Sequence, residues 1–542
     1  MEETSRDVLS FDGAAGDGFE LCCCCNQAAR VEWSTGQLAA EPELVSPSSE
    51  AMVYGLPIVI RPLRQQAVRM PAVVKFCDLW LYGSGLRFPG ARMSPGQSSR
   101  CVAARVAALG AARSATTDVS PPYKMKRRRS LGFRVSVELP FSSSTMAAPS
   151  TEIFHATATA PVNIAVIKYW GKASTKLNTP TNSSLSVTLS QDDLRTITTA
   201  SCSPSFESDA LWLNGAAHDV SNARSQACFA ELRALRKAKE DKDQSLPPLS
   251  TYKLHLISEN NFPTAAGLAS SAAGFAAFVR AIADLYELDE SPTELSRIAR
   301  QGSGSACRSL FGGFVAWEKG SRNDGYDSVA VQVAPESHWP TIRAAILVIS
   351  DAKKGVSSTS GMQATVATST LFPNRANTVV PARMDAMKKA IAEKDFESFA
   401  DLTMADSNSF HAVCLDTIPP IFYMNDASRA AIRVVEEINR CAGKKVAAYT
   451  FDAGPNAVIY YDESNQDIVL GALRKGTADV PGWTEKQPHI TACLPEGFNE
   501  AVLAPLSGNV SRVILTGVGS GPLKVPKQQA LIDEQGNPRP AS

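Results

Sequence analysis

Several features that define other protein classes are missing from this sequence. Its 542 residues carry 54 Lys and Arg against 54 Asp and Glu, so the net charge is zero. A chain-wide basic surface for nucleic acid or anionic lipid is therefore excluded, although a local patch is not. The sequence has no run of about 18 consecutive apolar residues, which argues against a transmembrane helix. Its six histidines show no HExxH spacing, so a zinc hydrolase is not predicted.

The 12 cysteines have no spacing typical of a disulfide framework. Six lie before residue 146, four of them in the run 22–25, and the other six are scattered without a CxxC pair. In a chain of this length, the scatter indicates reduced thiols and a cytosolic protein. The run 22–25 could bind a metal, but no second cluster of ligands completes a four-ligand site.

The first 145 residues differ in character from the rest. Their short apolar runs are interrupted by proline, glycine and arginine, and no helix or strand periodicity lasts. The basic run 124–129 is compatible with a nuclear-import or anion-binding patch, and a solvated basic segment is the simpler interpretation. Glu2, Glu3 and Asp7 argue against a secretory signal or transit peptide. We expect residues 1–145 to be a disordered or spurious extension, with Met146 as a natural start.

From residue 146 onward the pattern is that of a folded α+β protein. Apolar or alternating segments at 162–169, 184–189 and 252–258 predict strands. Ser291 and Glu294 form a capping box around Pro292 and predict a helix there. After Trp339 and Pro340, we predict strands at 343–349, 446–451 and 457–461 and helices at 356–370, 381–393, 395–409 and 427–442. The predicted domains are 146–339 and 340–523, followed by a disordered tail over 524–542.

The segment 263–274 is rich in glycine, serine and alanine and leads into a helix. Small side chains let a phosphate approach the backbone amides at a helix N-terminus, where the helix dipole also favours negative charge. A small-residue helix packed in a core is an equally good interpretation of the composition alone. The GxxxxGK[ST] pattern of P-loop NTPases is absent. A second Gly-rich segment, 517–522, follows a predicted strand but precedes no helix, so it fails the context test for dinucleotide binding.

The first segment resembles the phosphate loop of the galactokinase, homoserine kinase, mevalonate kinase and phosphomevalonate kinase (GHMP kinase) superfamily. Ala269 stands where the kinases often have glycine. In this departure the segment resembles the diphosphomevalonate decarboxylase branch of the superfamily. Five further segments resemble the same branch in the same order, within about residues 150–523: the N-terminal signature segments 160–172 and 177–186, the substrate loop 303–309, and segments 356–362 and 448–456. The resemblance says nothing about residues 1–145.

This resemblance implies a two-domain GHMP kinase-type fold. The N-terminal ATP-binding domain would be like domain 2 of ribosomal protein S5, and the C-terminal domain would be ferredoxin-like. It implies ATP- and Mg²⁺-dependent decarboxylation of (R)-5-diphosphomevalonate to isopentenyl diphosphate through 3-phosphorylation, in the mevalonate pathway of isoprenoid and sterol biosynthesis. It also implies a cytosolic homodimer with no nucleic-acid or membrane partner. The chemistry agrees, because direct loss of CO₂ would leave a carbanion without an electron sink, whereas a phosphate ester supplies a leaving group.

The resemblance also assigns residues. The catalytic set is Asp452, Lys168 and Arg308. Substrate binding is assigned to Tyr169, Trp170, Gly171, Lys172, Arg224, Ser303, Gly304, Ser305, Ala306, Cys307, Arg308 and Thr359. ATP binding is assigned to Gly267, Leu268, Ala269, Ser270, Ser271 and Ser358, with Ser271 also near Mg²⁺. Without the resemblance, Asp452 is a common turn residue, Lys168 and Arg308 are surface charges, and Ser358 and Thr359 are helix caps.

Two other functions remain open at this level. The first is a kinase of the same superfamily that phosphorylates mevalonate or phosphomevalonate without decarboxylation. The second is a non-catalytic binding protein whose basic run 124–129 contacts nucleic acid. The segments around Arg308 and Asp452 favour the decarboxylase.

Overall fold

The computed structural model describes residues 152–262, 269–350, 355–483 and 489–539. The extension predicted over residues 1–145 lies outside these residues. The described part has a mixed α and β fold, as predicted. Its largest sheet has the order β16-β1-β6-β9-β7-β8, and only β7 and β9 pair in parallel. The strands are β1 (Phe154–Pro161), β6 (Arg195–Ser203), β7 (Ala210–Leu213), β8 (Ala216–His218), β9 (Lys253–Asn260) and β16 (Leu523–Val525).

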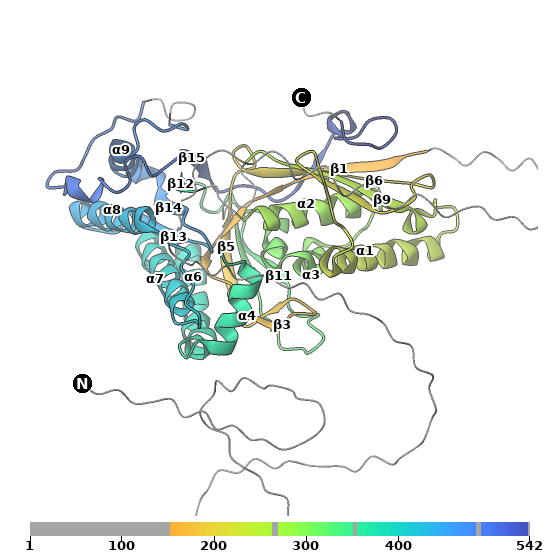
Figure 1. Cartoon of the computed structure of the whole chain (residues 1–542), viewed down its shortest axis with the longest axis horizontal. Helices are drawn as coiled ribbons and strands as arrows, with labels where there is room; N and C mark the ends of the chain where they lie inside the picture. Colours follow the sequence, from red (N-terminus) through yellow and green to blue (C-terminus); the bar gives the residue numbers. More distant parts are fainter. Residues whose placement is uncertain (1–151, 263–268, 351–354, 484–488, 540–542) are drawn as a thin grey trace, which may run out of the picture. The chain divides into compact units, whose positions relative to one another are not determined.

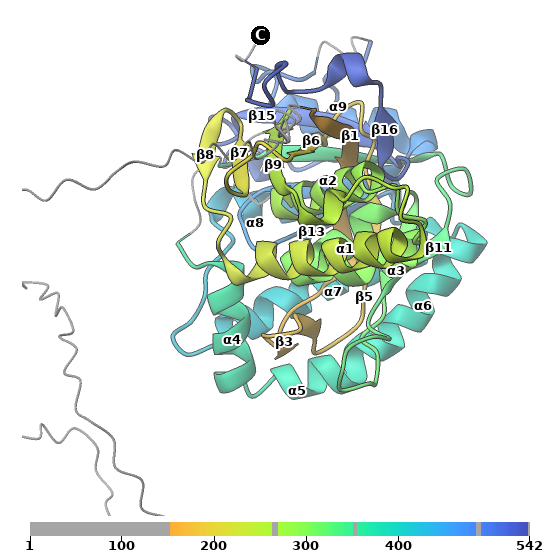
Figure 2. The ribbon, with the colours of Figure 1, turned by 90° about the vertical axis from the view of Figure 1, so that its right-hand side faces the viewer.

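Helix α2 covers one face of this sheet, and α1 and α3 pack against α2 on its far side (Figures 1 and 2). These helices are α1 (Ala223–Lys242), α2 (Ser270–Leu285) and α3 (Pro292–Gly302). Helix α2 packs on β1 and β6 through buried alanines, whose small side chains allow a close approach. Helix α3 begins with the predicted capping box of Ser291 and Glu294. The small-residue character of α2 therefore serves core packing.

A second sheet, of order β11-β10-β5-β2, lies between this layer and the C-terminal half of the chain. Its strands are β2 (Asn163–Ile167), β5 (Ser184–Thr188), β10 (Phe314–Trp317) and β11 (Ala330–Ala334). Every residue of β2, β5 and β10 is buried, which explains why 162–169 forms a near-continuous apolar run. A short hairpin of β3 (Lys172–Ser174) and β4 (Thr179–Pro180) and the 3₁₀ segment η2 (Gly304–Leu310) border this sheet.

The third sheet has the order β13-β14-β12-β15 and is antiparallel throughout. Its strands are β12 (Ile342–Val348), β13 (Ala447–Phe451), β14 (Ala457–Asp462) and β15 (Arg512–Gly517). Its helices are α4 (Ser358–Thr368), α5 (Phe372–Asn374), α6 (Val380–Glu393), α7 (Phe396–Leu415), α8 (Asp426–Ala442) and α9 (Gln466–Gly476), with a π-turn η3 (Arg375–Val379) joining α5 to α6.

Helices α7 and α8 pack on β13, and α7 also contacts β2 in the second sheet. One apolar cluster runs from Ile164 and Phe314 through Trp339 to Ile346. The proposed domain boundary at residue 339 stays a prediction, because the core is continuous across it.

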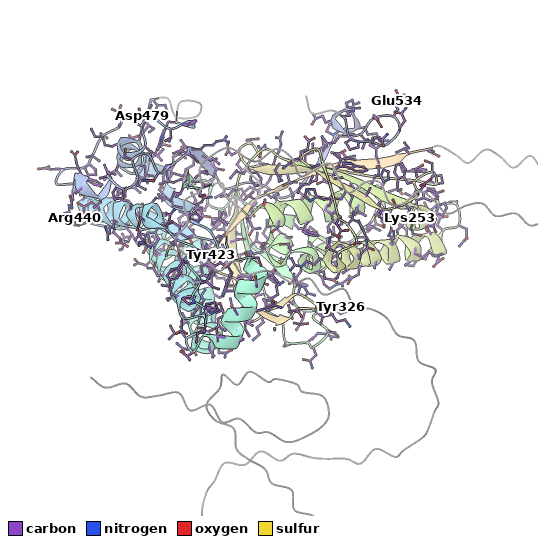
Figure 3. The ribbon with its side chains drawn as sticks, in the orientation of Figure 1. Lys253, Tyr326, Tyr423, Arg440, Asp479 and Glu534 are labelled. Carbon is purple, nitrogen blue, oxygen red and sulfur yellow. The ribbon has the colours of Figure 1, made fainter. Side chains whose placement is uncertain are left out.

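The tail predicted to be disordered from residue 524 is packed over 524–539. Strand β16 pairs with β1, and Ala530 and Ile532 are buried against Ile257 of β9. Side chains alternate along a strand, so Ile257 points to the face opposite the one that α2 covers. The sequence analysis missed this packing because segment 524–539 is mostly polar. A few alternating apolar residues, here Ala530 and Ile532, are enough to cover part of a sheet face. Glu534 lies exposed at the outer edge of this segment (Figure 3).

We expect Ile532→Ala to lower the free energy of unfolding by roughly 2 kcal/mol or more, because a buried isoleucine leaves a cavity when truncated. Leu523→Ala is the matched control: Leu523 is 51% exposed, against 4% for Ile532, and its loss should stay within about 0.5 kcal/mol. Urea denaturation measures both. Equal losses would contradict the packing of this segment.

Candidate active site

A cleft of about 340 Å³ opens where the end of β2, the start of α2, η2, the start of α4 and the turn after β13 meet. It gathers most of the residues that the sequence predicted. The predicted residues that line it are Lys168, Tyr169, Trp170, Lys172, Arg224, Ala269, Ser270, Ser271, Ser303, Gly304, Ser305, Arg308, Ser358, Thr359 and Asp452. Gly267 and Leu268 lie outside the described residues.

A buried ion pair lies at the centre of the cleft. Lys168 follows β2 directly and Asp452 follows β13, 284 residues later, yet Lys168 Nζ lies 2.7 Å from Asp452 Oδ1. The lysine side chain is 3% exposed and the aspartate side chain 29%. Burial lowers the pKa of Lys168, and the carboxylate of Asp452 opposes that shift. Lys168 is therefore not a surface charge, and Asp452 presents the accessible side of the pair to the cleft.

Arg308 is a second buried cation, and its contacts are neutral. Its Nε donates to Asn163 Oδ1 (3.2 Å) and Ser186 Oγ (3.0 Å), and its Nη1 donates to Ser184 Oγ (2.6 Å). The guanidinium carbon lies 6.0 Å from the centre of the Trp317 ring. Burial lowers the pKa of Arg308. No acidic residue in the described part of the chain forms an ion pair with it, and a buried charge held only by neutral groups favours an anionic ligand.

The start of α2 forms the serine-lined side of the cleft. Ala269 has a left-handed backbone (φ 54°) and makes no side-chain cap, so the helix begins at Ser270 with its N-terminal end beside the cleft. The hydroxyls of Ser271 and Ser303 lie 3.3 Å apart. A helix N-terminus carries a partial positive charge and binds phosphate groups well.

The start of α4 also lines the cleft, through Ser357, Ser358 and Thr359. Ser357, which the sequence analysis did not single out, is the N-cap and accepts from the amide of Ser360 at 3.1 Å. Ser358 and Thr359 occupy the first turn instead. Arg224 Nη2, from α1, donates to Thr359 Oγ1 at 2.8 Å and so joins the two halves of the chain beside the cleft.

Lys172 and Tyr169, which line the cleft together with Arg224, also favour the binding of an anion. Burial, with a smaller effect from Arg224, lowers the pKa of Lys172 to about 8. The hydroxyl of Tyr169 is buried without a hydrogen-bond partner among the described residues, and its ring packs edge-on against Trp317 at 4.6 Å. An unpartnered buried hydroxyl is costly, and a ligand oxygen would satisfy it.

Three residues that the resemblance assigned to the substrate do not line the described cleft. Ala306 and Cys307 are buried behind it, and Cys307 Sγ donates to the carbonyl of Gly304 at 2.9 Å. Gly171 has a left-handed backbone, with φ +85°. Conversely, the lining includes residues that the sequence analysis did not assign: Asn163, Ala165, Asn178, Ser357, Met362, Phe410 and Ala453. Asn163 lay inside a quoted segment, but an uncharged amide in a strand gives no signal of its own.

We expect Gly171→Ala to destabilise the fold more than Gly215→Ala. Both glycines have positive φ (+85° and +77°), a conformation that costs an L-residue about 1–2 kcal/mol. A Cβ at Gly171 would also lie 2.5 Å from atoms of Phe372 and Thr181, whereas one at Gly215 meets nothing within 4 Å. Thermal or urea unfolding should show at least about 1 kcal/mol of extra loss for Gly171→Ala. Equal losses would argue against the close packing.

The fold and this cleft, with a serine-lined helix N-terminus facing buried cations, define a GHMP kinase-type protein. Two family models match the chain: "Diphosphomevalonate decarboxylase-like N-terminal domain" over residues 160–330 and "Mevalonate 5-diphosphate decarboxylase C-terminal domain" over residues 344–525. The chain belongs to the diphosphomevalonate decarboxylase family.

Similar proteins agree with this assignment. The diphosphomevalonate decarboxylase of Schizosaccharomyces pombe is 61% identical over 389 residues, which cover 72% of this chain and 98% of that protein. The Saccharomyces cerevisiae enzyme is 58% identical over 391 residues, covering 70% and 98%. A crystal structure of mevalonate 5-diphosphate decarboxylase has 57% identity and a TM-score of 0.65, covering 70% of this chain and 98% of that one. A structure described as "MDDEF in complex with MVAPP, AMPPCP and Magnesium" has 31% identity and a TM-score of 0.54, covering 69% and 100%.

The described residues include neither a membrane-spanning helix nor a cluster of metal ligands. No helix there has the length and apolar character needed to cross a membrane. No group of three or more His, Cys, Asp and Glu side chains there could hold a metal ion.

Proposed function

We propose that this protein converts (R)-5-diphosphomevalonate and ATP into isopentenyl diphosphate, ADP, phosphate and CO₂. The observation that carries the proposal is the shared cleft: the Lys168–Asp452 pair, the buried Arg308 and the serine-lined start of α2 all face one cavity. Relatives of this name and the structure with MVAPP and an ATP analogue bound support the same reaction. The described thiols are free, which fits a reducing compartment. We include cytosolic location and homodimer formation in the proposal.

In this proposal Asp452 receives the proton of the C3 hydroxyl while the oxygen attacks the γ-phosphorus of ATP, and the bond from that phosphorus to the leaving ADP breaks. Lys168, whose Nζ lies 2.7 Å from Asp452 Oδ1, keeps that carboxylate oriented. The C3–oxygen bond then breaks, and its electron pair leaves with the phosphate. The C1–C2 bond supplies the pair that forms the C2–C3 double bond, and C1 departs as CO₂. Arg308 can hold the C1 carboxylate with parallel hydrogen bonds, which orients it for departure.

The cleft has one group of residues suited to the substrate diphosphate and another suited to the ATP phosphates. Tyr169, Lys172 and Arg224 suit the substrate diphosphate, with the hydroxyls of Ser303 and Ser305 beside them. Ser270, Ser271 and Ser358 suit the ATP phosphates. Since the described residues offer no carboxylate cluster, Mg²⁺ would be carried mainly by those phosphates, with Ser271 nearest; bound there, it would neutralise phosphate charge.

An apolar pocket of about 240 Å³ adjoins the start of α2 and suits the base of the nucleotide. It shares Ser270 and Ser271 with the cleft and is walled by Leu211, Leu213 and Phe275. A flat purine buries well against such side chains. A nucleotide lying across these serines would place its phosphates in the cleft.

We expect Asp452→Asn to abolish CO₂ release from labelled diphosphomevalonate while ATP affinity stays within about threefold, because the amide cannot accept the hydroxyl proton. Asp462→Asn is the control: that carboxylate ends β14 and bonds Thr341 (2.5 Å) and Ser464 (2.7 Å), away from the cleft lining. Near-normal turnover by Asp452→Asn would remove its proton-accepting role. Phosphate transfer without CO₂ by the unaltered protein would instead identify a kinase of the superfamily.

The pKa of Lys172 predicts a pH dependence of substrate binding. Because that pKa is about 8, the lysine is a cation below pH 8 and loses its charge above it. The KM for diphosphomevalonate should therefore rise between pH 7.5 and 9.5. In Lys172→Arg the guanidinium stays charged, so this rise should be absent. Parallel KM profiles for the two proteins would contradict the assignment of Lys172 to the diphosphate.

A further inference from the structure

The main chain of Lys168 is held by side chains rather than by a sheet. The pairing of β2 with β5 ends at Ile167, one residue earlier. The amide of Lys168 donates to Asp406 Oδ2 at 2.7 Å. Its carbonyl accepts from Asn182 Nδ2 at 3.0 Å and from Arg375 Nη2 at 3.4 Å. The residue that carries the cleft's central cation therefore takes its position from these three side chains.

Two of the three form a buried ion pair. Arg375 binds Asp406 through two parallel contacts, Nη1–Oδ1 at 3.0 Å and Nη2–Oδ2 at 2.9 Å, and their side chains are 2% and 0% exposed. Arg383 adds a third contact to Oδ1 at 3.1 Å. Burying such a pair loses hydration that its attraction only partly recovers, so stability alone is a weak reason to have one here. A geometric task beside the cleft is a stronger reason.

We propose that Asp406 and Arg375 are positioning residues, which fix the main chain of Lys168 so that its ammonium group holds Asp452 against the substrate. This inference rests on the proposed function, because it assigns Asp452 the role given there. It adds a part of the chain, α7 and the π-turn before α6, that the sequence analysis did not assign to the site.

The physical link is short and rigid. The amide of Lys168 contacts Asp406, and the Nζ atom of Lys168 contacts Asp452 at 2.7 Å. A shift of the main chain would pass directly to the ammonium group, because burial leaves the side chain little room to compensate. A misplacement of about 1 Å in a catalytic group can cost roughly 100-fold in rate.

The same arrangement affects charge. Asp406 and Asp452 favour the protonated form of Lys168, while Arg308 disfavours it. Removing the charge of Asp406 would lower the pKa of Lys168 further and leave Arg375 uncompensated nearby. The alkaline limb of kcat should then move to lower pH. The charged or titratable groups that face Lys168 from the surrounding elements are Asp452, Asp406, His411, Arg308 and Arg375.

The test compares Asp406→Asn with Asp416→Asn in the CO₂-release assay. Both aspartates belong to the α7 region, and Asp416 bonds Ser369 (2.7 Å) and the amide of Leu371 (3.1 Å) without touching Lys168. We expect Asp406→Asn to lower kcat at least tenfold, with KM for both substrates within about twofold and the alkaline limb at lower pH. Asp416→Asn should keep the kcat and pH profile of the unaltered protein. An unchanged kcat and alkaline limb in folded Asp406→Asn would overturn the inference.

A double variant covers the case in which Asp406→Asn does not fold. Asp406→Asn with Arg375→Gln removes one charge of each sign, so the core keeps its charge balance. We expect it to fold and still show the kcat loss at unchanged KM. Turnover equal to that of the unaltered protein would overturn the inference. An unaltered protein that releases no CO₂ would refute the proposed function instead.

Discussion

The central constraint on this structure is the cost of taking a lysine out of water. Lys168 is almost completely buried, and an ammonium group there needs an anion within hydrogen-bond distance. Asp452 is that anion, and it comes from the other half of the chain. The pair can form only when the turn after β13 lies against the end of β2. Helix α7 makes this possible, because it packs on both strands.

The side chains that line the cleft carry an excess of positive charge. Lys168 has an anionic partner, whereas Arg308 has hydroxyls, an amide and an aromatic ring. Lys172 and Arg224 lie on the same cleft. The cleft thus holds more cations than anions, and a ligand bearing a carboxylate and a diphosphate would supply the missing negative charge. The charge of the cleft therefore favours an anionic ligand.

Local pattern was enough to predict much of the fold. The helix at Pro292 was predicted from its cap and the buried strand β2 from its apolar run, and helices were also predicted where α6 and α8 lie. The C-terminal tail was predicted wrongly, and β1, the β7–β8 hairpin and α9 were not predicted. For the tail and β1, the stabilising contacts come from distant segments: β1 lies between β6 and β16, and Ile532 packs on β9. The β7–β8 hairpin is different, because its Asn214-Gly215 turn, with positive φ at both residues, is a local signal that the sequence analysis did not use. Composition alone carries little trace of contacts between distant segments.

The order of residues establishes which chemical groups are present and which short segments carry them: the serine-rich helix start, the arginine after Ser-Ala-Cys, and the aspartate in its turn. It also allowed the resemblance that names their roles. Which of these groups come into contact depends on how the chain packs. Asp452 with Lys168, Asn163 with Arg308, and Asp406 with the amide of Lys168 are separated by 284, 145 and 238 residues. A single sequence records residue types in order but no distances, and these pairs exist because β2, β13, η2 and helix α7 pack together beside one cleft.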